Sequence, residues 1–111
     1  MGRQSILDMK VSKVYPLWVQ KAERKGRTRE ELDRIIAWLT GYDMSTVDQD
    51  MTLSGFFSDA PAMNPRANLI TGSVCGIKVE EITDPLMQRI RWLDKLVDEL
   101  AKGKPVEKIL R

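Results

Sequence analysis

Few side chains in this sequence could do chemistry, and histidine is missing altogether. The chain therefore lacks the commonest general acid/base and metal ligand near neutral pH. Cys75 is the only strong soft nucleophile, and Lys78 is the only cation near it in the sequence. Catalytic cysteines usually have a histidine or a positive neighbour. We interpret Cys75 as a structural thiol, with a reactive thiol as the alternative.

Three carboxylates, Glu80, Glu81 and Asp84, precede the longest predicted helix. Such a group could do acid/base work or bind a hard metal ion. We favour a structural interpretation, in which Asp84 caps the helix and the other two carboxylates interact favourably with the positive N-terminal end of the helix dipole. Gly72 and Gly76 lack the Lys-Ser/Thr pair of a phosphate-binding loop. We therefore predict no catalytic residue, no metal site and no cofactor, and we expect a protein that is not an enzyme.

Three residues at the edges of apolar helix stripes form the predicted interaction surface, and they are Trp38, Arg89 and Trp92. A charge at a core edge needs a partner or a route to solvent. Arg89 should therefore either pair with a carboxylate of residues 43–59 or line an anion pocket. Each tryptophan either caps the core or anchors an interface, because tryptophan is enriched at binding hot spots. The expected partner is an unknown protein or a second copy of the chain.

A second hypothesis is weak nucleic-acid binding by a basic turn containing Lys25, Arg27 and Arg29. Two helices around a glycine-containing turn resemble a helix-turn-helix. Against this, Glu30 and Glu31 would face phosphate at the start of the recognition helix.

Charge is distributed unevenly along the chain. Residues 1–34 have a net charge of +4, residues 35–84 of −5, and residues 85–111 of +3. Either these fields largely cancel within the fold, or a basic face is available to an anionic partner.

The clearest structural signal is a helix over residues 84–103. Asp84 is a good N-cap, Pro85 suits the first helical position, and Gly103 suits the end. One stripe of the helix is apolar and must be covered by other helices. Its members are Leu86, Ile90, Leu93, Val97 and Leu100.

Weaker signals place further helices along the chain. Ser12 could cap a helix over about 13–25. Thr28 and Glu31 form a capping box for a second helix that ends at Gly41. Ser45 could start a short helix to about residue 51, another short piece contains residues 53–57, and a last turn covers 105–110. Residues 66–83 fit a strand, a short helix or an irregular segment equally well.

Together these patterns predict an all-α fold, a small orthogonal bundle of about five helices with little or no sheet. We expect residues 1–10 to be a flexible N-terminal arm and residues 11–111 to be a single helical domain. No apolar run reaches the roughly 18 residues of a membrane helix, and the N-terminus has no apolar signal core. One cysteine fits a reducing compartment, so we predict a cytoplasmic protein without membrane contact.

Several segments resemble a known bacterial family, domain of unknown function 2200. They are Lys10–Pro16, Lys21–Thr28, Trp38–Tyr42, Leu69–Gly72, Val74–Ile82, Asp84–Gln88 and Leu93–Lys104. The resemblance runs from about residue 9 to the end of the chain. It implies a small, mostly helical, stand-alone bacterial protein, and it implies no activity, ligand or partner.

Overall fold

Helix α4 (Pro85–Ala101) lies at the centre of a computed structural model that describes residues 6–74 and 76–110. Both ends of α4 form as predicted. The Asp84 side chain accepts hydrogen bonds from the backbone N–H of Leu86 at 3.0 Å and of Met87 at 3.3 Å, and Pro85 occupies the first turn. Gly103, with φ of 96°, lies just beyond the helix.

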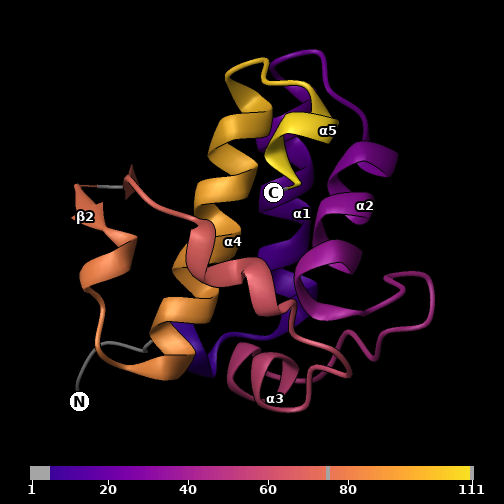
Figure 1. The fold of residues 1–111 in the computed structure, drawn as a ribbon. Helices are drawn as coiled ribbons and strands as arrows, with labels where there is room; N and C mark the ends of the chain where they lie inside the picture. Colours follow the sequence, from indigo (N-terminus) through magenta and orange to yellow (C-terminus); the bar gives the residue numbers. More distant parts are fainter. Residues whose placement is uncertain (1–5, 75, 111) are drawn as a thin grey trace.

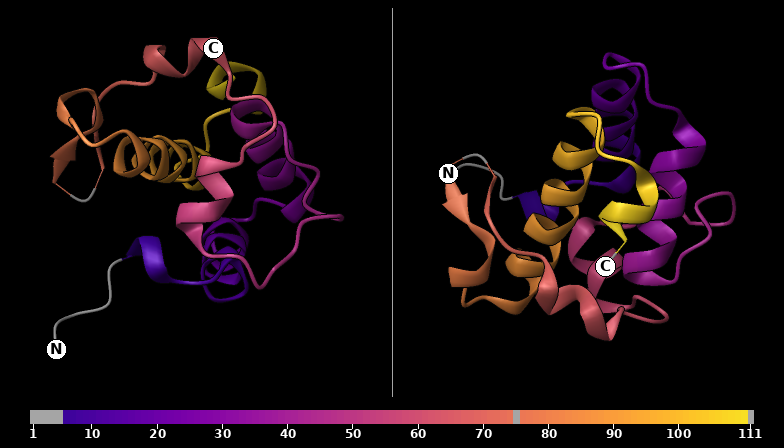
Figure 2. Two further views of the ribbon diagram at one scale, coloured as in Figure 1. Left: turned by 90° about the horizontal axis from the view of Figure 1, so that it is seen from below. Right: turned by 45° about the horizontal axis from the view of Figure 1, so that its top comes forward.

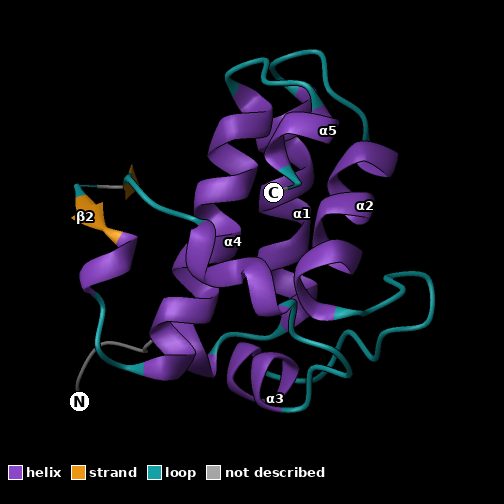
Figure 3. Cartoon of the chain, in the orientation of Figure 1, coloured by secondary structure: helices purple, strands orange, loops and turns teal. Residues whose placement is uncertain are grey.

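The other described α-helices pack against α4, and in Figure 1 they lie to its right and below it. They are α1 (Val11–Glu23), α2 (Arg29–Thr40), α3 (Leu53–Ser58) and α5 (Val106–Ile109), with 3-10 turns η1 (Ile6–Asp8), η2 (Pro65–Leu69) and η3 (Val79–Glu81). Strands β1 (Ser73–Val74) and β2 (Ile77–Lys78) pair antiparallel on the side of α4 away from α2 (Figures 1 and 2). The predicted small helical bundle is confirmed, and this hairpin is the only sheet in the described residues (Figure 3).

The core forms where α1, α2, α3 and α4 pack together. The apolar face of α2, made of Leu32, Ile35, Ile36 and Leu39, is fully buried, as are Phe56 and Phe57 of α3. Trp18 of α1 is only 6% exposed and belongs to the same core. The capping box of Thr28 and Glu31 is present, and α2 ends at Gly41 in the left-handed conformation, with φ of 81°.

The start of α1 differs from the prediction. Ser12 lies inside the helix, and Lys10 is the N-cap without a side-chain hydrogen bond. The N–H groups of Val11 and Ser12 instead bond the carbonyls of Met51 and Gln49, each at 2.9 Å. Carbonyls far along the chain therefore accept the hydrogen bonds that an N-cap side chain would otherwise accept.

One further expectation is corrected. The predicted helix at 45–51 is a series of turns, and the Ser45 hydroxyl bonds the Asp43 carboxylate. Residues 6–10, part of the predicted N-terminal arm, contain η1 and a bridge from Lys10 to Thr52. Ile6, Leu7 and Met9 pack against the core, and the flexibility of the arm stays a prediction. Residues 1–5 lie outside the described part of the chain.

Candidate functional site

Arg89 joins α4 to the end of α3. Its Nη1 donates a hydrogen bond to the backbone carbonyl of Phe57. This acceptor falls within the predicted range of residues 43–59, but it is a carbonyl and not a carboxylate. Carbonyls in the last turn of a helix lack partners within that helix, so a cation is well placed there. Arg89 therefore has a structural contact that the sequence did not indicate.

Trp38 and Trp92 differ from Trp18 in their polar contacts. The Trp18 indole N–H donates to Asp94 Oδ1 at 3.2 Å. Trp38 and Trp92 are partly buried against the core, and neither indole N–H has an acceptor in residues 6–74 and 76–110. They belong to different helices, whereas Arg89 and Trp92 are three residues apart and so are neighbours on one face of α4.

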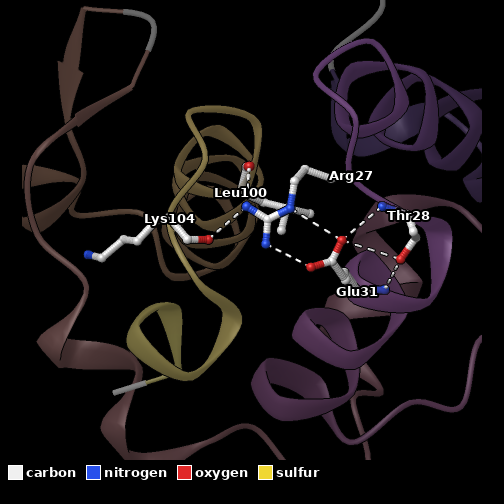
Figure 4. A network of polar contacts seen from close by, with 5 residues as sticks. All are labelled: Arg27, Thr28, Glu31, Leu100 and Lys104. Carbon is white, nitrogen blue, oxygen red and sulfur yellow. Dashed lines mark hydrogen bonds and ion pairs between the residues drawn. The ribbon is translucent and has the colours of Figure 1, made fainter.

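Arg27, a predicted nucleic-acid contact, is held inside the protein (Figure 4). Its Nη1 donates to the carbonyls of Leu100 at 3.2 Å and Lys104 at 2.9 Å. Its Nε and Nη2 bond the two carboxylate oxygens of Glu31 at 3.2 and 2.7 Å. These hydrogen bonds from Arg27 hold the pKa of Glu31 at about 2. The side chain joins the start of α2 to the connection between α4 and α5.

Arg29, the second predicted contact, faces Tyr15 on α1. Its Nε donates to the Tyr15 hydroxyl at 3.2 Å, and its guanidinium lies 5.7 Å from the ring centroid. The same hydroxyl donates a hydrogen bond to Asp33. Burial and this bond to Asp33 raise the pKa of Tyr15. Lys25 and Arg29 are both exposed and have no ion pair in the described structure, and of the three predicted contacts only Lys25 also lacks a side-chain hydrogen bond there.

Two of the three candidate carboxylates have structural partners. Asp84 caps α4, and Glu80 accepts a hydrogen bond from the Gly72 N–H at 3.0 Å. No three His, Cys, Asp or Glu side chains among the described residues are grouped so as to hold a metal ion. Cys75 lies outside the described residues.

Two surface features were not predicted from the sequence. Leu17 on α1 is 55% exposed, with basic side chains on the same face of the helix. A shallow hollow of about 420 Å³ lies between α2 and the following loop, and Glu30, Asp33 and Asp43 are among its lining residues. The position of Leu17 off the buried stripe of α1 was a detectable signal. The hollow had no signal in the sequence, because it forms only where the loop after α2 folds back against that helix.

The fold and this surface define a small, mainly helical protein. The chain belongs to the family described as an uncharacterised protein conserved in bacteria, domain of unknown function 2200, whose model matches residues 5–111. It is also similar to a solved structure, that of the uncharacterised protein SP1917. The two are 45% identical with a TM-score of 0.89, over 98% of this chain and 94% of that one. No match was found among curated proteins. Within the described residues, no helix combines the length and apolarity needed to cross a membrane.

Proposed function

We propose that this protein is a cytoplasmic interaction module that binds another protein through helix faces and also associates with itself. One observation carries the proposal: Trp38 and Trp92 are partly buried, and their indole N–H groups lack an intramolecular acceptor in the described residues. A tryptophan whose ring packs on the core while its N–H reaches the surface is suited to anchor a partner.

The nucleic-acid alternative has less support from the same residues. Arg27 bonds two backbone carbonyls and Glu31, and Arg29 bonds Tyr15. Freeing either guanidinium for phosphate would break these contacts. Arg24 and Lys25 are the exposed cations of the turn that have neither an ion pair nor a side-chain hydrogen bond in the described structure.

The test is capture of partners from cell lysate by tagged protein, with and without nuclease. Trp38→Phe and Trp92→Phe keep an aromatic ring against the core and remove the N–H donor. We expect a protein partner that resists nuclease and is depleted with at least one of the two variants. Lys108→Ala, at an exposed position on α5, is the matched control and should capture the partner normally.

Two outcomes would contradict the proposal. Capture that is abolished by nuclease would favour nucleic-acid binding instead. Equal capture by the wild type and both tryptophan variants would show that binding does not depend on the indole N–H of Trp38 or Trp92.

A further inference from the structure

We propose that copies of this chain bind head to tail, with Leu17 of one copy entering the acidic hollow beside α2 of the next. The inference rests on the proposed function, because it names a second copy as one partner. It concerns surfaces separate from Trp38 and Trp92, so the two ideas can fail independently.

The first surface is the outer face of α1, which we call the Leu17 face. At about 100° per residue, one side of the helix presents one apolar residue among polar and basic ones. The Leu17 face comprises Lys10, Lys13, Leu17, Gln20 and Arg24, and all five are exposed. No ion pair involves its three cations within residues 6–74 and 76–110. The face therefore combines an uncovered leucine with unpaired positive charge.

The second surface is the hollow between α2 and the loop that follows it. Three lining residues are acidic, Glu30, Asp33 and Asp43, and one, Arg34, is basic. The net charge of the lining is therefore −2. Ala37 and Met44 supply apolar surface in the same hollow. Its charge is opposite to that of the Leu17 face, and its volume of about 420 Å³ leaves room for a leucine side chain.

The two surfaces cannot meet within one molecule. Tyr15 faces α2, since its hydroxyl bonds Arg29 and Asp33. Leu17 is two residues further along α1, or about 200° around its axis, and so points away from α2. A contact between unlike surfaces on different sides is heterologous, and it extends from copy to copy unless the rotation closes a ring.

The character of Leu17 favours a protein occupant over nucleic acid. Phosphates would pair with the lysines and the arginine, but they would leave the central leucine facing a charged, hydrated backbone. A hollow lined by both apolar and acidic residues accommodates both parts of the face. Because the contact is small and its ion pairs are exposed, we expect weak association that salt reduces.

Sedimentation equilibrium over a wide range of protein concentration tests the proposal. The average mass of the wild type should rise with concentration and fall again with added salt. A face variant, Lys13→Glu with Leu17→Glu, should associate at least tenfold more weakly, and so should a hollow variant, Glu30→Lys with Ala37→Lys. All four positions are exposed, and circular dichroism would verify that each variant folds.

A mixture of the two variants gives the decisive result. The face variant retains an intact hollow, and the hollow variant retains an intact Leu17 face. Their equimolar mixture should therefore form a 1:1 dimer and nothing larger. Lys108→Glu, outside both surfaces, should associate like the wild type.

The proposal is overturned if the wild type remains a monomer throughout, if either variant associates as strongly as the wild type, or if the mixture shows no dimer. Binding of a DNA duplex that is lost with Lys13→Glu but unaffected by Leu17→Ser would assign the face to nucleic acid instead. A wild type that remains a monomer would also remove self-association from the proposed function. A nuclease-resistant partner that depends on Trp38 or Trp92 would still support the binding of another protein.

Discussion

Removing the Arg27 side chain should destabilise the fold more than removing any exposed arginine. The guanidinium donates hydrogen bonds to the carbonyls of Leu100 and Lys104, each worth about 1 kcal/mol. A cation at the end of α4 adds about 0.5 kcal/mol. The ion pair between Arg27 and Glu31 adds about 0.5 kcal/mol, since their side chains are 14% and 32% exposed, respectively.

Arg27→Ala should therefore lower the free energy of unfolding by about 3 kcal/mol. For a chain of this length the melting temperature should fall by about 13 °C. Arg27→Lys should recover only part of the loss, since an ammonium group cannot reproduce the planar fork that bonds Glu31 and two carbonyls at once.

Urea denaturation followed by circular dichroism measures these differences. Arg24→Ala is the matched control, because Arg24 is exposed at the end of α1, and it should change stability by less than about 0.5 kcal/mol. If Arg27→Ala were no more destabilising than Arg24→Ala, the network of Figure 4 would not contribute to stability and the reasoning would be refuted.

The remaining predictions concern one carboxylate and one glycine. The pKa of Glu31, about 2 in the folded protein and below its usual value, means that its contribution to stability is present above about pH 4.5 and is lost as pH falls toward 2. An NMR titration should return this pKa toward its usual value in Arg27→Ala, and an unchanged value would show that Arg27 is not its cause. In urea denaturation, Gly41→Ala should lower the free energy of unfolding more than Gly26→Ala. Both glycines have positive φ, but only at Gly41 would a new Cβ lie 2.9 Å from Ala62 Cβ. Equal costs would contradict the close approach.

Local signals explain what the sequence could predict. Asp84, Pro85 and Gly103 define α4 through groups within a few residues of its ends, and Thr28 with Glu31 does the same for α2. The periodicity of apolar residues then identified the buried face of α4. These features require no knowledge of the rest of the chain.

Long-range contacts explain what it could not predict. The two backbone carbonyls that accept hydrogen bonds from Arg27 lie 73 and 77 residues along the chain, so its sequence neighbourhood did not indicate them. The N–H groups at the start of α1 depend on the carbonyls of Gln49 and Met51. Each strand of the hairpin has two residues, too few for an alternating pattern to be detected.

Candidate sites divide in the same way. The sequence identified Trp38 and Trp92 as edge residues, and the structure leaves their N–H groups without acceptors among the described residues. It did not identify the carbonyl of Phe57 as the partner of Arg89, because that pairing depends on how α3 packs against α4. The hollow beside α2 likewise requires the tertiary structure.

Photo-crosslinking in living cells tests the interaction-module account most directly. A photoreactive benzoylphenylalanine would replace Trp38 or Trp92 in turn, with Lys108 on α5 as the control position. The account predicts a covalent adduct with a protein of defined mass from position 38 or 92 and none from position 108. Adducts from neither tryptophan position, or equal adducts from all three, would contradict it.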